Sequence, residues 1–170
     1  MTDIAARRAA LFALFDRLGI ATTTYEHEAV FTVAESRHVK EQIPGGHTKN
    51  LFLKDKKGRL FLVVALGDAV IDLKRLHEVI GASGRLSFGS GELLEEVWGV
   101  KPGSVTPFGA ITDTAGRVTV ILDVTMMEHA VLNYHPLENT ATTSIARDDL
   151  VAFLEATGHP PQILPCSESV

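Results

Sequence analysis

The apolar residues of the chain recur at helical spacing in several segments. Between residues 3 and 18 they repeat on one helical face, and Gly19 follows where such a helix would end. Thr32 and Glu35 have the spacing of a capping box, which predicts a helix that continues to about Gln42. Further helices are expected at residues 72–81, 91–98 and 148–158.

Shorter apolar runs bounded by turn residues predict strands. Leu51–Leu53 and Leu60–Leu66 flank a Lys-Lys-Gly turn, an arrangement typical of a β-hairpin. A second hairpin is expected from residues 110–112 and 117–123. Other short strands are expected at residues 21–26, 85–88, 131–134 and 140–146. Because hairpins dominate between the helices, the pattern predicts an α+β fold: a mixed, largely antiparallel, curved sheet with helices packed around it.

Length and composition fit one soluble domain. We interpret residues 1–170 as a single domain, with residues 160–170 as a C-terminal tail. No apolar run approaches the roughly 20 residues that span a bilayer, and the N-terminal segment with Asp3 is unlike a signal peptide. Cys166 is the single cysteine, and no Cys/His spacing resembles a zinc site. We therefore expect a cytoplasmic protein without a metal ion, a cofactor or a membrane contact.

Charge is unevenly distributed along the chain. The net charge of −5 argues against general nucleic-acid binding. However, Arg37 to Arg59 contains seven Lys and Arg against two acids, a local excess of five positive charges. This excess favours contact with a few phosphates, although a solvated hairpin would show the same pattern. The candidate cations on the hairpin are Lys54, Lys56, Lys57 and Arg59.

A polar cluster stands where the first strand of that hairpin begins. His47, Thr48, Lys49 and Asn50 follow two glycines and precede the apolar run. Lys49 has the reach and charge to contact a phosphate or a polarised carbonyl, and Asn50 can both donate and accept hydrogen bonds. The alternative is a solvated strand end, which is the more common setting for such residues.

A second candidate is His135, which precedes Pro136. A residue before proline is held in an extended conformation, so the direction of its side chain is restrained. Together with Asn133 and Asn139, His135 could line a cleft. The sequence contains neither a Gly-x-Ser-x-Gly elbow nor a phosphate-binding loop, and Cys166 lies in the expected tail. The histidines 38, 77, 129 and 159 are interpreted as surface or core residues.

Four stretches in the right order resemble one family, the YbaK/prolyl-tRNA-synthetase-associated domain family. The resemblance covers nearly the whole chain and is to the free-standing prolyl-tRNA editing proteins of the ProXp-ala or PrdX type. Its carriers are residues 26–32 (Glu-His-Glu-Ala-Val-Phe-Thr), 46–55 (Gly-His-Thr-Lys-Asn-Leu-Phe-Leu-Lys-Asp), 103–109 (Gly-Ser-Val-Thr-Pro-Phe-Gly) and 133–140 (Asn-Tyr-His-Pro-Leu-Glu-Asn-Thr).

The resemblance implies hydrolysis of the ester that links a wrong amino acid to tRNA, without metal or cofactor. Lys49 matches the family's substrate-anchoring lysine, Asn50 its neighbour, and His135 the histidine of the amino-acid pocket. These three are the expected catalytic residues. The expected partners are mischarged tRNA, through its 3′ end and acceptor stem, and prolyl-tRNA synthetase as a second candidate.

Physical reasoning favours alanine on tRNA(Pro) as the substrate. A site shaped for proline cannot exclude the smaller alanine, because each missing methylene gives only about 1–3 kcal/mol of discrimination. A second site that admits alanine and rejects proline by size would restore selectivity. The candidate walls are Val30, Phe31 and Phe108, although core packing explains each equally well. Further expected substrate-binding residues are Thr32, Gly46, His47 and Asn133.

Two functions therefore remain open from the sequence. The first is a trans-acting deacylase of mischarged tRNA(Pro), with Ala-tRNA(Pro) as the favoured substrate, or a deacylase of the same family with another amino-acid specificity. The second is a non-catalytic module that binds tRNA or a synthetase. Catalysis requires Lys49 and a pocket of defined size, whereas docking requires only the summed charge of the hairpin.

Overall fold

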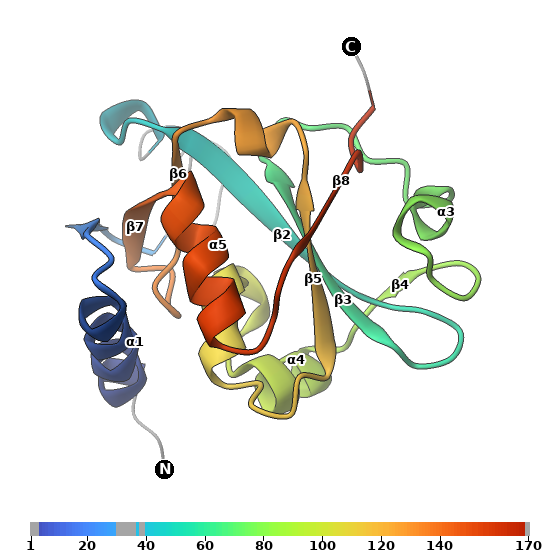
Figure 1. Ribbon diagram of the computed structural model, residues 1–170, viewed down its shortest axis with the longest axis horizontal. Helices are drawn as coiled ribbons and strands as arrows, with labels where there is room; N and C mark the ends of the chain where they lie inside the picture. Colours follow the sequence, from blue (N-terminus) through green and yellow to red (C-terminus); the bar gives the residue numbers. More distant parts are fainter. Residues whose placement is uncertain (1–3, 30–36, 38–39, 169–170) are drawn as a thin grey trace.

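The computed structural model describes residues 4–29, 37 and 40–168 (Figure 1). An eight-stranded sheet with the order β1-β7-β6-β2-β3-β5-β8 forms the centre, and β4 pairs with β2. The strands are β1 (Thr22–Glu26), β2 (Gly46–Lys54), β3 (Leu60–Leu66), β4 (Ser87–Phe88), β5 (Val118–Asp123), β6 (Val131–Tyr134), β7 (Ala141–Ala146) and β8 (Gln162–Leu164). The helices are α1 (Ile4–Leu18), α3 (Leu76–Ile80), α4 (Gly91–Trp98) and α5 (Arg147–Ala156), with 3-10 helices η1 (Pro102–Ser104), η2 (Pro107–Ile111) and η3 (Met126–Glu128).

The sheet mixes both strand orientations. Antiparallel pairs join β1 to β7, β7 to β6, β2 to β3 and β2 to β4. Parallel pairs join β2 to β6, β3 to β5 and β5 to β8. The predicted α+β fold with a mixed sheet and surrounding helices is confirmed, and so is the first hairpin.

One face of the sheet carries the main hydrophobic core. Because side chains alternate along a strand, Phe52 and Leu62 point to this face, where they join buried residues of α1, α4 and α5. Phe15 of α1 and Phe153 of α5 pack tilted against each other with ring centroids 5.5 Å apart. Trp98 of α4 is fully buried beneath them and donates its indole N–H to the Thr106 carbonyl at 2.6 Å.

The opposite face is covered over only part of its width. Leu53 of β2 and Val63 of β3 form a second cluster with Leu76 and Ile80 of α3 and with Cys166. The strands β1, β7 and β6 present polar side chains on this same face. By register, these are Thr23 and Tyr25 of β1, Thr142 and Ser144 of β7, and Asn133 of β6. We call this half of the sheet the polar face.

Several sequence expectations are corrected by the structure. Residues 160–170 were expected to be a tail, but β8 pairs with β5 there, because Ile163 and its neighbours can extend the parallel edge of the sheet. The prediction of the second hairpin is wrong for its first strand, because residues 107–111 form η2, which Thr106 caps. The helix expected at 72–81 shortens to α3. Within the described residues, no helix is long and apolar enough to cross a membrane.

Candidate functional site

The site is built where β2 and β6 separate. These two strands pair in parallel at Gly46–Leu132 and His47–Asn133, and β6 ends one residue later. Lys49 and His135 each lie two residues beyond the last pair, on the two diverging chains. Because side chains alternate along a strand, Lys49 belongs to the same face as His47. His135 follows the end of β6, and its ring lies 6.4 Å from that of His27, whose Nε2 contacts Thr142 Oγ1 on this polar face. The point where β2 and β6 separate, which we call the β2–β6 split, therefore places a cation and an imidazole on one face of the sheet. The two groups come from distant parts of the sequence.

Lys49 is half-buried and its ammonium group is directed by the backbone. Its Nζ donates to the carbonyl oxygen of Ala69, in the segment after β3, at 2.5 Å. An ammonium group has three N–H donors, so two remain for a substrate.

Asn50 points to the opposite face of β2 from Lys49, on the same side as Phe52. Its Oδ1 is buried and has no hydrogen-bond partner among the described residues. An unpaired buried acceptor costs about 1–3 kcal/mol, so a ligand donor there would be stabilising. The predicted pair of neighbours, Lys49 and Asn50, thus reaches two different sides of the strand.

His135 is held as a neutral imidazole of known tautomer. Its Nδ1 lies 2.8 Å from the carbonyl oxygen of Ala141, and a carbonyl can only accept, so Nδ1 carries the proton. Burial lowers the pKa of His135 below its ordinary value, the hydrogen bond to Ala141 opposes this, and nearby His27 lowers it further. At neutral pH, Nε2 therefore presents a lone pair.

The loop that follows His135 is rigid and strained. Leu137 is buried, yet its φ is 74°, in the left-handed region that non-glycine residues rarely occupy. Glu138 accepts a hydrogen bond from Thr140 Oγ1 at 2.5 Å and faces Arg8 of α1 at 3.6 Å. Such strain persists only where surrounding contacts over-determine it, and it clusters at functional sites.

His27 is a site residue that the sequence reasoning missed. Its ring centroid lies 6.4 Å from that of His135, and its Nε2 is 2.8 Å from Thr142 Oγ1. The other ring nitrogen donates to the Glu28 carbonyl at 2.8 Å. The signal available in the sequence was its position inside residues 26–32, one of the four stretches that carry the family resemblance.

Asn133 and His47 shape the turn that precedes β2. Asn133 Nδ2 donates to the carbonyls of Pro44 and Gly46 at 3.0 and 3.2 Å, and its Oδ1 accepts from Ser144. His47 Nε2 donates to the Ile43 carbonyl at 2.8 Å. Asn133 is buried with its polar atoms occupied, so it positions the turn and is not free to contact a substrate.

One of the three predicted pocket-wall residues lies in the hydrophobic core, and the other two lie outside the described residues. Phe108 is fully buried and packs edge-on against Phe15 and Tyr134, with centroids 5.2 and 5.7 Å away. It therefore has no exposed surface with which to line a pocket. Val30, Phe31 and the predicted contact Thr32 lie outside the described residues.

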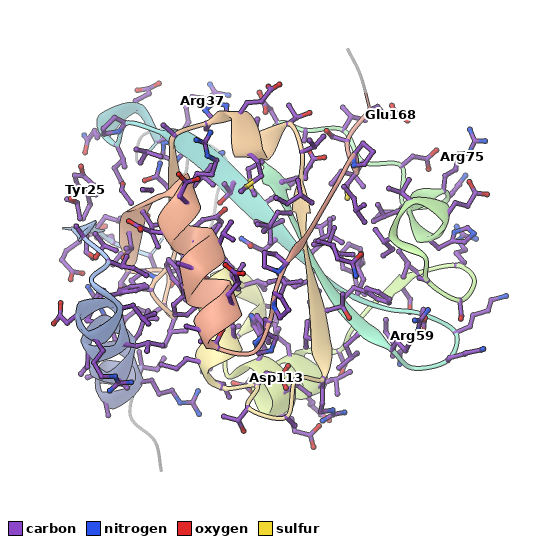
Figure 2. All side chains as sticks on the ribbon, viewed as in Figure 1. Tyr25, Arg37, Arg59, Arg75, Asp113 and Glu168 are labelled. Carbon is purple, nitrogen blue, oxygen red and sulfur yellow. The ribbon has the colours of Figure 1, made fainter. Side chains whose placement is uncertain are left out.

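The basic hairpin lies at the far end of β2 from the site. Five residues of extended strand separate Lys49 from Lys54, about 17 Å at 3.3–3.4 Å per residue. Figure 2 shows Arg59 near the hairpin tip and Tyr25 at the opposite end of the molecule. Lys54, Lys56 and Lys57 are exposed, whereas Arg59 is tied to Asp55 at 3.0 Å and to the Gly81 carbonyl at 3.0 Å.

The described residues offer neither a metal centre nor a thiolate nucleophile. Within them, no group of three or more His, Cys, Asp or Glu side chains could hold a metal ion. Cys166 is buried, and burial raises the pKa of its thiol to about 12, with Asp123 nearby adding to the shift. We therefore take the ammonium of Lys49 and the neutral imidazole of His135 as the candidate reactive groups of the site.

Comparison with known proteins identifies the family of this chain. Residues 27–153 match the family described as "Aminoacyl-tRNA editing domain". The chain is 43% identical over 150 residues to the Danio rerio "Prolyl-tRNA synthetase associated domain-containing protein 1", covering 87% of this chain and 81% of that protein. It is 36% identical over 151 residues to the "Prolyl-tRNA editing protein ProX" of Acetoanaerobium sticklandii, covering 88% and 92%.

A solved structure shares the fold. A crystal structure of a candidate trans-editing enzyme for prolyl-tRNA synthetase superposes with a TM-score of 0.72 at 21% identity, covering 99% of both chains. The match over residues 27–153 begins just after β1, ends within α5, and includes Lys49, His135 and the loop between β6 and β7. This chain belongs to the aminoacyl-tRNA editing domain family, the YbaK-type family that its four sequence stretches resemble.

Proposed function

We propose that this protein is a trans-editing deacylase that hydrolyses mischarged tRNA(Pro), with Ala-tRNA(Pro) as its principal substrate. The observation that carries the proposal is the placement of Lys49 and neutral His135 on one face where β2 and β6 separate. Family membership supports an editing reaction, and the prolyl-tRNA editing protein among its relatives supports tRNA(Pro) as the carrier.

Lys49 anchors the substrate by charge. Its two free N–H donors can contact the terminal phosphate or the ester carbonyl, and a preorganised cation beside that carbonyl stabilises the oxyanion that forms during attack. The hydrogen bond to Ala69 fixes the direction of the side chain before the substrate arrives. We assign Lys49 the role of an electrostatic anchor and not that of a general base.

His135 orients the amino acid. Its Nε2 lone pair accepts a hydrogen bond from the α-ammonium group of the aminoacyl ester, while Nδ1 stays bound to Ala141. Asn50 Oδ1 lies on the opposite face of β2 from Lys49, so we assign Asn50 no contact with the substrate that Lys49 and His135 hold.

The reaction itself is ester hydrolysis. Water, positioned by backbone groups and by the free ribose hydroxyl of the substrate, attacks the carbonyl carbon. The bond between that carbon and the ribose oxygen breaks. The ribose oxygen takes up a proton, and alanine leaves with its carboxyl group restored.

The competing function is a non-catalytic module that binds tRNA through the exposed lysines of the β2–β3 turn. That function needs no group at the β2–β6 split. The experiment is single-turnover deacylation of Ala-tRNA(Pro) by the purified protein, alongside binding of uncharged tRNA(Pro). Release of alanine well above the spontaneous rate supports the deacylase. Binding without release would overturn it in favour of docking.

A further inference from the structure

Two adjoining pockets surround the turn that leads into β2. One, of about 390 Å³, is lined by residues that include Lys40, His47, Asp68 and His129. The other, of about 430 Å³, is lined by residues that include Tyr25 and again His129. Both also include Gly45, so the two pockets meet along the Gly45–His129 boundary. We name the combined depression the turn groove and define it by Tyr25, Lys40, Gly45, His47, Asp68 and His129.

The turn groove adjoins the proposed catalytic site on two sides. Asp68 precedes Ala69, the residue whose carbonyl accepts from Lys49. On the other side, Ser144 lines the pocket that contains Tyr25 and donates to Asn133 Oδ1. A polymeric ligand whose end lies beside Lys49 would therefore continue into this groove.

We propose that the turn groove binds the single-stranded 3′ end of tRNA, the nucleotides that precede the terminal adenosine. This rests on the proposed function, because it assumes that the aminoacylated adenosine lies beside Lys49. The groove offers one cation, Lys40, several polar side chains and the aromatic ring of Tyr25, which are the kinds of group that contact phosphates and bases in single-stranded RNA.

Lys40 and His129 are the phosphate contacts. Lys40 is exposed and forms no ion pair within the described part of the chain, so its charge is available. The ring of His129 lies against Gly46: a Cβ built there would be 3.2 Å from its Cγ and 3.3 Å from its Nδ1. A glycine at this position therefore holds the imidazole close to the backbone at the groove boundary.

Gly45 and Gly46 are both needed for this arrangement. Gly45 has a φ of 103°, and a side chain on it would approach Asn133 Nδ2 to 3.0 Å and the Val131 carbonyl to 3.1 Å. Because Gly45 and Gly46 have no side chains, the turn packs closely onto β6, and the groove stays open between Lys40 and Tyr25.

Tyr25 and Asp68 supply the contacts to bases and sugars. Tyr25 is half-buried on β1 and offers a ring on which a base can stack. Asp68 would repel a phosphate, but a carboxylate accepts from the exocyclic amine of cytosine or from a ribose 2′-hydroxyl. The groove therefore has a phosphate part near Lys40 and His129 and a base part near Tyr25.

The test measures binding of uncharged RNA, so it is independent of catalysis. Two acceptor-stem microhelices are compared, one with the 3′ overhang ACCA and one blunt. We expect wild type to bind the overhang form more tightly than the blunt form. Three variants, Lys40→Gln, His129→Ala and Tyr25→Ala, should each lose about tenfold in affinity for the overhang form and bind the blunt form as wild type does. Lys40→Gln should also reduce the slope of log affinity against log salt by about 0.7.

Lys74→Gln is the matched control, because Lys74 is also exposed but lies before α3, outside the groove. It should bind both helices as wild type does, and Tyr25→Phe should retain the preference. Equal binding of the two helices by wild type, or equal losses on both helices in the variants, would overturn the proposal. A groove that binds the overhang in a protein without deacylase activity would leave this inference standing and reject only the proposed function.

Discussion

The Nζ of Lys49 lies 2.5 Å from the carbonyl oxygen of Ala69, which joins the first residues of β2 to the segment after β3. This contact fixes where the charge is held and leaves two N–H donors for a ligand. The side chain lies two residues beyond the point where β2 leaves β6, on the same face as His135.

Replacing Lys49 should abolish most hydrolysis. For Lys49→Ala we expect kcat/KM on Ala-tRNA(Pro) to fall by about 100-fold or more, as when one oxyanion donor is removed. The free energy of unfolding should change by about 1 kcal/mol or less, since one hydrogen bond from a half-buried side chain is lost. Lys74→Ala, which is exposed and lies outside both the site and the β2–β3 turn, is the control for charge. Cleavage by Lys49→Ala at the wild-type rate would show that the anchoring role is wrong.

His135 should give the reaction an acidic limb. Burial lowers the pKa of His135 below its ordinary value of about 6.5. The imidazole is neutral above this lowered pKa and protonated below it. Protonation removes the Nε2 acceptor, so activity should fall as the pH drops through that value. The ratio of wild-type to His135→Gln rates cancels the titration of the substrate. This ratio should be constant at high pH and approach one at low pH; a flat ratio throughout contradicts the assignment.

The β2–β3 turn should contribute to tRNA binding through charge. Lys56 and Lys57 are exposed, and reversing both to Glu should weaken binding of tRNA(Pro), with a larger loss at low salt because fewer counterions are released. The rate for bound substrate should change little, because these residues lie about 20 Å or more from Lys49 along the strand. Wild-type binding that does not vary with salt would remove the basis for this prediction.

Asp55 should matter for stability and not for chemistry. Burial alone would raise its pKa, but hydrogen bonds from the backbone of Ser83, Arg59 and Lys57 and from the Arg59 guanidinium lower it to about 2. Since the folded pKa is depressed, its stabilisation is present above about pH 4 and lost as the pH falls toward 2. Asp55→Ala should reduce the free energy of unfolding by about 2–3 kcal/mol, measured in urea at pH 7, and flatten the acid dependence. A variant as stable as wild type would contradict this.

The sequence predicted the elements whose signals are local. The hairpin at β2 and β3 followed from two apolar runs around Lys-Lys-Gly, and α4 followed from its apolar periodicity; the structure adds that Ser90 caps this helix. β8 was missed because three residues carry almost no periodic signal, and its pairing with β5 depends on parts of the chain distant in sequence.

The candidate site was predictable in its residues but not in its geometry. Lys49 and His135 were identified by motif, whereas their common face depends on the two-residue pairing of β2 with β6. Phe108 was assigned to a pocket because composition cannot distinguish a wall from a core, and its three aromatic neighbours decide for the core. His129 was interpreted as a surface or core residue and is exposed, but its contact with Gly46 is visible only in three dimensions.

The most direct test of the central claim is a panel of deacylation rates for alanyl-, glycyl-, seryl-, valyl- and prolyl-tRNA. Alanine and proline differ in size and not in charge, and a close-packed wall rejects extra atoms at a cost of about 1–3 kcal/mol. We expect alanyl-tRNA(Pro) to be cleaved fastest, seryl- and glycyl-tRNA in part, and valyl- and prolyl-tRNA hardly at all. Cleavage of prolyl- or valyl-tRNA by wild type as fast as alanyl-tRNA would contradict the account.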